Sequence, residues 1–279
     1  MVPDRGVGPG DPGGKLLPAA PGESADHWLL PLQAARYVAD VLCMVYFAVS
    51  SRFWEGRRGR RLARGVVLQQ VYFTAVQALP FTLMVALVFG ALAMIQASVQ
   101  LPRFGKREVE AITGLVIFRE LAPIIVALLV IARSTNAIVV EIGNMRLNGE
   151  LRALEILGIN IDRFLVLPRL TGMIISVPLL TVIFCAAALW GGFWVAKFSG
   201  FLESNFVLSR LSSSLDATLW WNVMVRAFFF ALVISSVSCH HGLRVKVSAT
   251  EVPQQATRAV ISSLSLCFLG NLVLSLAVL

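Results

Sequence analysis

The chain has 279 residues, of which 57% are hydrophobic and 14% are charged, and its mean hydropathy is +0.77. A soluble domain of this composition could not bury all of its apolar surface. The composition therefore excludes a soluble protein and predicts an integral membrane protein. The formal net charge of +8 does not indicate nucleic-acid binding, because the basic residues lie beside hydrophobic segments, where anionic lipid and membrane topology account for them.

The first 64 residues are predicted to lie on one side of the membrane. Residues 1–26 carry five prolines and six glycines and contain no apolar run of the length that a signal peptide needs, so we expect a disordered cytoplasmic tail. Residues 27–64 begin with an apolar segment that has one polar stripe, which is typical of a helix in the membrane interface, and end in a basic elbow. The stripe consists of Gln33, Arg36 and Asp40, and the elbow holds six arginines from Arg52 to Arg64.

Five later segments are long and apolar enough to cross a bilayer, which takes about 20 helical residues. They cover about residues 75–96, 109–140, 163–196, 218–240 and 257–279. With a cytoplasmic N-terminus, the elbow and the segments 133–169 and 240–258 lie inside, and they carry far more Lys and Arg than the outside loops 97–110 and 197–216. This asymmetry supports the orientation, because basic residues accumulate on the cytoplasmic side.

The second of these segments contains charged residues. Only twelve uncharged residues separate Glu120 from Arg133, about 18 Å of helix, whereas the bilayer core is roughly 30 Å thick. Either Arg119 and Glu120 form a functional polar site below the membrane surface, or they mark the outer edge of the segment and Arg133 lies inside the crossing. Pro123 leaves the Arg119 carbonyl without its helical partner, so we also expect a bend.

A short amphipathic helix is predicted over about residues 141–158, between the second and third segments. We expect Asn148 to cap it and Gly158 to end it in the left-handed conformation. One face carries Leu147, Leu151 and Leu154, while Arg146, Glu150, Arg152 and Glu155 face elsewhere. Such a helix is either the surface on which an external motor pushes or an ordinary connector lying on the membrane surface.

The fourth segment contains a single arginine, Arg226, about 8 Å deeper than Trp220 and Trp221. Its side chain either reaches back to the lipid headgroups or lines an aqueous pocket. The sequence has no GxxxxGK[ST] phosphate loop, so any ATP that drives the protein is bound by another chain. Its four cysteines and three histidines show no metal-ligand spacing. We therefore expect no metal, no cofactor and no catalytic site.

Several blocks of the sequence resemble the MlaE/YrbE family. These proteins are the permease subunits of ABC transporters that work with MCE proteins to move lipids between bacterial membranes. The resemblance covers about residues 65–279. It lies in RELAPIIVALLVIAR, AIVVEIGNMR, LRALEILGINIDRFLVLPR, VPLLTVIFCAAALWGGF and QATRAVISSL.

The resemblance implies a multi-pass homodimer in the bacterial inner membrane, with phospholipid as its cargo. Each subunit would have an N-terminal interfacial helix, five transmembrane helices and a cytoplasmic coupling helix. The dimer would sit on two copies of an ABC ATPase and below a hexameric MCE-domain protein, and it would contribute to the lipid asymmetry of the outer membrane. The ATPase contact would include Glu141, Met145, Arg146, Glu150, Arg152 and Glu155, and the lipid cavity would include Arg119, Glu120, Pro123 and Asn271.

Two positions depart from the family pattern. Pro253 stands in the loop before the last span, where a glycine is common. Asn271 stands in the last span where an acidic residue is often found, which removes a charge and keeps hydrogen bonding.

Two other functions stay open from the residues alone. One is a proton-coupled secondary carrier of lipids or other amphiphiles, with Glu120 as the group that titrates. The other is a membrane-embedded lipid transferase, which would need a histidine–carboxylate pair or a cluster of acids near one interface. The sequence does not contain such a constellation.

Overall fold

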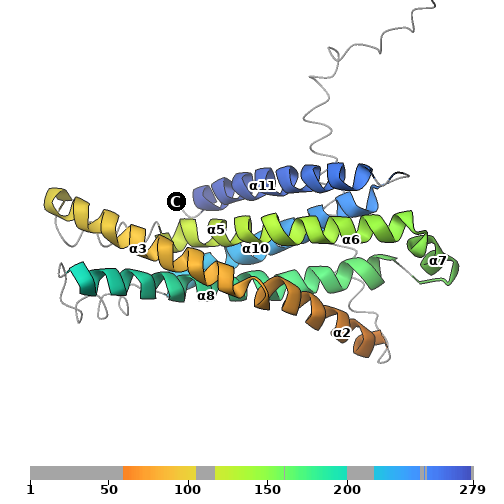
Figure 1. Ribbon diagram of the computed structural model, residues 1–279, viewed down its shortest axis with the longest axis horizontal. Helices are drawn as coiled ribbons and strands as arrows, with labels where there is room; N and C mark the ends of the chain where they lie inside the picture. Colours follow the sequence, from red (N-terminus) through yellow and green to blue (C-terminus); the bar gives the residue numbers. More distant parts are fainter. Residues whose placement is uncertain are drawn as a thin grey trace, which may run out of the picture. The chain divides into compact units, whose positions relative to one another are not determined.

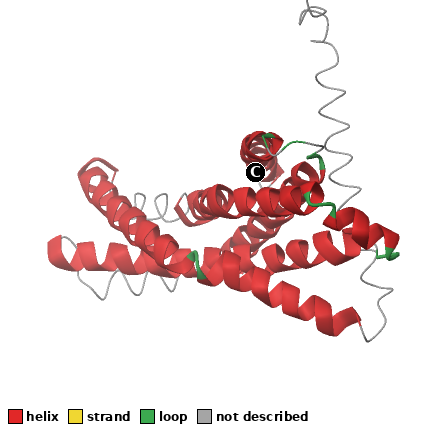
Figure 2. Ribbon diagram, turned by 45° about the vertical axis from the view of Figure 1, so that its right-hand side comes forward, coloured by secondary structure: helices red, strands yellow, loops and turns green. Residues whose placement is uncertain are grey.

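The computed structural model describes residues 59–104, 117–159, 161–199, 217–245, 248 and 250–277. The predicted tail and the predicted interfacial helix lie outside these residues, and the end of the basic elbow is the start of helix α2 (Gly59–Val71). The described helices belong to one compact unit, Val41–Leu279. Figure 2 shows helices joined by short loops, and no strand occurs in the part of the chain that is described.

Five helical segments of the described chain are long and apolar enough to cross a membrane. This confirms the predicted all-α integral membrane fold. A helix suits hydrocarbon because it satisfies its backbone hydrogen bonds within itself. The first to fifth spans are Gly65–Gln96, Arg119–Leu147, Phe164–Val195, Thr218–Leu243 and Glu251–Ala277.

The first span packs along the third. Its helix α2 is followed by a π-helical turn, Tyr72–Val76, and by α3 (Leu79–Phe104), which lies against α8 (Leu167–Ser199) (Figure 1). A Cβ atom at Gly90 would lie 1.8 Å from the carbonyl oxygen of Ala188. Glycine is therefore required where the two backbones touch, as at other small-residue interfaces between membrane helices.

The second span is irregular at its charged residues. It consists of a π-helical turn Ile117–Leu121, α5 (Ala122–Val130), a second π-helical turn Ile131–Thr135, and α6 (Asn136–Leu147). The first π-helical turn ends beside Pro123, whose missing N–H interrupts the regular hydrogen-bond ladder. Arg119 and Glu120 lie in the first of these turns and Arg133 lies in the second. The charged sites predicted from the sequence thus coincide with the places where the helix departs from regular geometry.

The connector between the second and third spans differs from its prediction in one detail. α6 runs on to Leu147, and a separate short helix, α7 (Glu150–Ile156), begins after Gly149. Gly149 has a φ of 76°, a conformation that glycine adopts readily, so the chain turns there. Asn148 therefore ends α6. The prediction that its side chain caps the short helix is wrong, because Gly149 stands at that position of α7. Gly158 has a φ of 74° and closes the connector in the predicted left-handed conformation.

The fourth span, α10 (Ala217–Leu243), is the most enclosed of the five. In its most apolar window 61% of the residues are buried in protein, against 22% for the first span and 17% for the fifth. α10 packs against α6, α8 and α11 (Glu251–Ala277). The first and fifth spans consequently turn most of their apolar side chains outward, toward lipid or toward another subunit.

The contact between α3 and α8 gives a test of this packing. Replacing Gly90 by Ala should destabilise the protein by about 1–3 kcal/mol, because the added methyl group meets the α8 backbone. The matched change Gly65→Ala adds the same group where no atom lies within 4 Å, and it should be neutral or stabilising by up to about 1 kcal/mol. Thermal unfolding of the two purified variants in detergent measures the difference. Equal melting temperatures would contradict the packing described.

Candidate functional site

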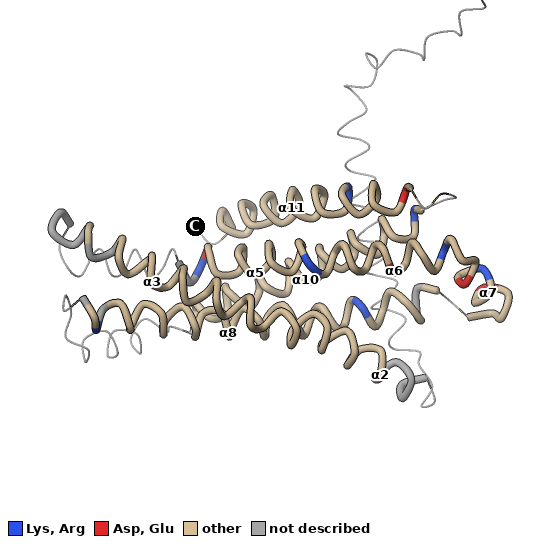
Figure 3. The backbone as a smooth tube through the Cα atoms, viewed as in Figure 1, with Lys and Arg blue, Asp and Glu red and all other residues tan. Residues whose placement is uncertain are grey.

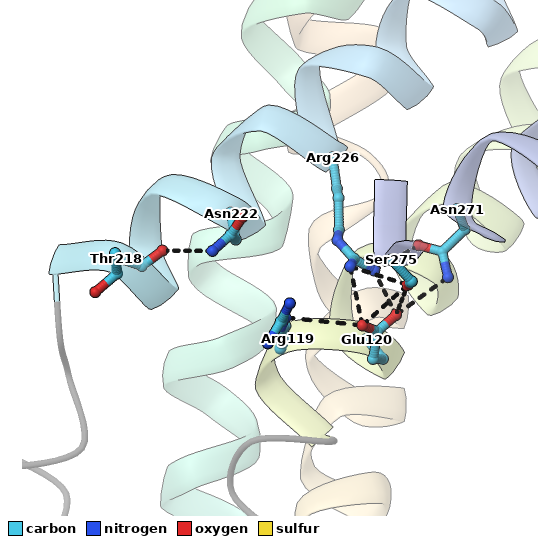
Figure 4. Close-up of polar contacts among 7 residues, drawn as sticks. All are labelled: Arg119, Glu120, Thr218, Asn222, Arg226, Asn271 and Ser275. Atoms are coloured by element: carbon cyan, nitrogen blue, oxygen red, sulfur yellow. Dashed lines mark hydrogen bonds and ion pairs between the residues drawn. The ribbon is translucent and has the colours of Figure 1, made fainter. Parts of the chain in front are cut away.

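Four side chains from three spans meet in a polar cluster, shown in Figure 4. We call Glu120, Arg226, Asn271 and Ser275 the polar cluster. Arg226 forms a two-pronged ion pair with Glu120, in which one guanidinium nitrogen contacts Oε2 and Nη2 donates to Oε1 at 2.9 Å. The same guanidinium donates to Asn271 Oδ1 at 2.8 Å and to Ser275 Oγ at 3.0 Å.

The acceptors on Glu120 are saturated by the same neighbours. The Asn271 amide nitrogen donates to Glu120 Oε2 at 3.2 Å, and the Ser275 hydroxyl lies 3.0 Å and 3.1 Å from the two carboxylate oxygens. Arg226 is only 1% exposed. A buried charge is tolerated only when it is paired and its remaining hydrogen-bonding groups are satisfied, and the polar cluster meets both conditions.

The polar cluster extends the sequence interpretations. Arg226 is buried and pairs with Glu120 of the second span. Its two predicted roles, reaching the headgroups or lining an aqueous pocket, stay predictions. Glu120 and Asn271, predicted as lipid-site residues, are brought together, but their polar groups face each other and Arg226. Ser275, which the sequence reasoning missed, lies four residues after Asn271 and so on the same helix face. The four-residue spacing from Asn271 is the one signal in the sequence that could have identified Ser275.

Arg119 differs from the other charged residues of this region. Its side chain is 20% exposed, and its Nε lies 3.9 Å from Glu120 Oε1, which is too far for a hydrogen bond. That nitrogen is buried and has no hydrogen-bond partner among the described residues. Figure 4 shows Arg119 on the side of Glu120 that faces away from Asn271. The carboxylate is thus hydrogen-bonded to Arg226, and among the described residues Arg119 has only this longer ion pair with the same carboxylate.

An apolar pocket begins one helical turn from the polar cluster. It is a shallow depression with a cavity volume of about 10 Å³, and it lies between the second, fourth and fifth spans. Ile124 and Phe230 line it four residues after Glu120 and Arg226, and Cys267 lines it four residues before Asn271. The remaining lining residues are Ala127, Leu128, Ile131, Leu264 and Phe268. Pro123, another predicted lipid-site residue, is buried among the packed helices and does not line this pocket.

Arg133 is held by the first span. Its Nη1 donates to the Gln77 carbonyl oxygen at 2.6 Å and its Nη2 donates to Gln77 Oε1 at 2.7 Å. The guanidinium carbon also lies 5.4 Å from the centroid of the Phe73 ring, a cation–π distance. The second span, Arg119–Leu147, therefore contains both the pair at 119–120 and Arg133. The two alternatives drawn from the sequence for the depth of Arg119 and Glu120 stay predictions.

Exposed charged residues gather at the other end of the second span (Figure 3). Glu141 is 62% exposed on its side chain and forms an ion pair of 2.9 Å with the buried Arg169 of α8. The predicted motor-contact residues Arg146, Glu150, Arg152 and Glu155 are exposed, and Met145 is half-buried. Ile156 and Leu157, at the end of α7, are 80% and 72% exposed. The connector thus presents charged and apolar side chains together.

The described residues contain no group of three or more His, Cys, Asp or Glu side chains that would hold a metal ion. The charged groups described above are instead arranged as ion pairs and hydrogen-bonded contacts between spans.

Comparison with known proteins identifies relatives of the chain. The model of a family described as "Permease MlaE" matches residues 67–277. The chain is 28% identical to the intermembrane phospholipid transport system permease protein MlaE of Haemophilus influenzae, over 74% of this chain and 79% of the relative. It is 27% identical to a probable ABC transporter permease protein of Rickettsia bellii, over 75% and 82% of the two chains. The chloroplast protein TRIGALACTOSYLDIACYLGLYCEROL 1 of Arabidopsis thaliana is 25% identical over 75% of this chain and 60% of its own length.

Removing one partner of the polar cluster should be far worse than removing both. Replacing Arg226 by Met leaves the Glu120 carboxylate, whose side chain is 28% exposed, without its cation, and we expect a loss of about 1–3 kcal/mol. Adding Glu120→Gln to that variant should recover a large part of the loss, because no charge then remains unpaired. Thermal unfolding in detergent of the two single variants and the double variant measures this coupling.

Ser275→Ala serves as the control, since it removes one neutral hydrogen-bonding group and should cost about 1 kcal/mol. If the two substitutions at Arg226 and Glu120 have simply additive costs, the ion pair does not stabilise this region.

Proposed function

This chain belongs to the MlaE permease family, and we propose that it is the membrane-spanning subunit of an ATP-driven transporter that moves phospholipid between the bacterial inner membrane and an MCE-domain protein. The relatives support this proposal, since one carries the name of a phospholipid transport permease and another that of an ABC transporter permease. The observation that carries it is the polar cluster beside an apolar pocket, within five membrane spans. A phospholipid has the same two parts, a charged headgroup and apolar chains.

The proposed lipid site has a fixed part and a free part. The polar cluster is fixed, because Glu120, Arg226 and Asn271 satisfy one another. Arg119 is the free part, because its guanidinium has no hydrogen-bonded partner among the described residues and remains partly exposed. We assign headgroup contact to Arg119, since a guanidinium binds phosphate oxygens through charge-assisted hydrogen bonds. The acyl chains would then lie against apolar side chains of the spans, such as those around Ile124.

The proposed motor contact is the connector at the other end of the second span. Exposed charges such as Arg152 and Glu155 would pair with complementary charges on an ATPase subunit, and Ile156 and Leu157 would be covered by it. The family resemblance assigns Glu141, Met145, Arg146 and Glu150 to the same contact. ATP itself would be bound by the partner, as the chain has no phosphate loop.

Movement of the connector would reach the lipid site through packed helices. Glu141 ties α6 to α8 through Arg169. A Cβ atom at Gly242 of α10 would lie 2.8 Å from Cβ of Ile142, so α6 and α10 are in close contact. α10 in turn carries Arg226 of the polar cluster. Closure of the ATPases would therefore bias the arrangement of the spans around the lipid, as a ligand biases a two-state equilibrium.

The proposed assembly is a homodimer with two ATPase copies and a hexameric MCE-domain partner, with the N-terminus in the cytoplasm. Outward-facing apolar side chains of the first and fifth spans leave surface for a second subunit. In a bacterium with an outer membrane, such a transporter would contribute to lipid asymmetry. The bonding of Glu120 argues against the proton-coupled carrier, because a carboxylate already held by Arg226, Asn271 and Ser275 is poorly placed to exchange protons with water.

Co-purification and lipid-stimulated ATP hydrolysis test the proposal. The chain should recover an ABC ATPase from its own cells, and the complex should hydrolyse ATP faster when phospholipid vesicles are supplied. Reversing both connector charges, with Arg152→Glu and Glu155→Arg, should reduce recovery of the ATPase about tenfold or more, because complementary charges become like charges. The folding of the membrane region should not change, since both side chains are exposed.

The matched control is Lys197→Glu, which reverses an exposed charge near the opposite end of the third span and should leave ATPase recovery intact. Lipid movement by the isolated chain, driven by a proton gradient without nucleotide, would refute the proposed function.

A further inference from the structure

The charges at the lipid site do not balance. Three charged side chains meet there, two arginines and one glutamate, and the other members of the polar cluster, Asn271 and Ser275, are neutral. Glu120 and Arg226 cancel as a two-pronged pair. Among the described residues no second carboxylate pairs with Arg119. Among the described residues one positive charge is therefore left over, at the start of the second span.

The geometry indicates that this charge is available to a ligand. The Nε of Arg119 is 3.9 Å from the nearest carboxylate oxygen and has no hydrogen-bond partner, although it is buried. A buried donor without an acceptor costs free energy, and a charged donor costs more. A group outside the described chain that accepts a hydrogen bond from Nε would remove this cost. The side chain is 20% exposed, so an oxygen of a bound molecule can reach it. Both observations point to an anionic group as the missing partner.

The apolar surroundings of Arg119 restrict what the rest of that molecule can be. Arg119 is the first residue of an apolar segment long enough to cross a membrane. A molecule that reaches it from the membrane must join an anionic group to a hydrocarbon chain. Phospholipids do so, but they fall into two classes. A zwitterionic headgroup brings an ammonium group that cancels the phosphate charge, whereas an anionic headgroup such as glycerol phosphate keeps a net negative charge.

We propose that this site selects phospholipids whose headgroup carries a net negative charge, and that Arg119 is the residue that sets the preference. Asn271 contributes by being neutral, because a carboxylate there would offer the site a second negative charge. The proposal rests on the proposed function for its ligand class and adds the headgroup selectivity. In a medium of low dielectric an unmatched charge attracts a net anion much more strongly than a zwitterion.

Equilibrium binding to the purified full-length chain tests the selectivity. Fluorescent phosphatidylglycerol and phosphatidylcholine with identical acyl chains are titrated into the protein in neutral detergent at low ionic strength. We expect phosphatidylglycerol to bind roughly tenfold more tightly, the scale of one charge-assisted hydrogen bond. Arg119→Gln should abolish the difference between the two lipids, mainly by weakening phosphatidylglycerol. Arg119→Lys keeps the charge and should retain most of the preference.

Arg133→Gln is the matched control, because it removes the same charge from the same span at a residue bonded to Gln77. That variant should bind the two lipids as the unaltered chain does. Equal affinities in the unaltered chain, or a preference that survives Arg119→Gln, would overturn the selectivity and leave the proposed function standing. Failure to bind either lipid would instead count against the proposed function itself, and with it the selectivity.

Discussion

The ion pair between Arg226 and Glu120 is the interaction on which the rest of the structure depends. A guanidinium that is 1% exposed within a membrane span cannot remain without a counter-charge, because hydrocarbon offers no hydrogen-bonding groups. The pair fixes how the second and fourth spans face each other, and Asn271 and Ser275 bring in the fifth span. The placement of the apolar pocket and of Arg119, which shares the Glu120 carboxylate at 3.9 Å, follows from the same arrangement.

The spans were predictable because apolar composition is a local property of the sequence, whereas the partners of charged residues are not. Arg226 and Glu120 are 106 positions apart, and nothing near Arg226 indicates which helix face it meets. The connector shows the same limit on a smaller scale. The left-handed conformation of Gly158 was predicted correctly, because it depends on the backbone freedom of that residue alone. The capping role predicted for Asn148 was wrong, because the chain turns at Gly149 before α7 begins.

The second span joins the two ends of the proposed machine. Its first π-helical turn carries Arg119 and Glu120, its second carries Arg133, and its last helix leads into the exposed connector. Arg133 fastens the middle of the span to Gln77 of the first span, and Glu141 fastens the far part to Arg169 of the third. π-helical turns are local departures from the regular ladder and are common at functional sites. A change at the connector can thus alter the lipid site without unfolding the span.

A charge pair between the second and fourth spans holds the proposed lipid site together. The most direct test is to exchange the two charges, with Glu120→Arg and Arg226→Glu in one chain, and to measure lipid-stimulated ATP hydrolysis by the assembled transporter. Asn271 and Ser275 can both donate and accept, so they can satisfy either arrangement. The account predicts that the exchange restores a substantial part of the activity that each single substitution removes. An exchanged protein as inactive as the single variants would contradict it.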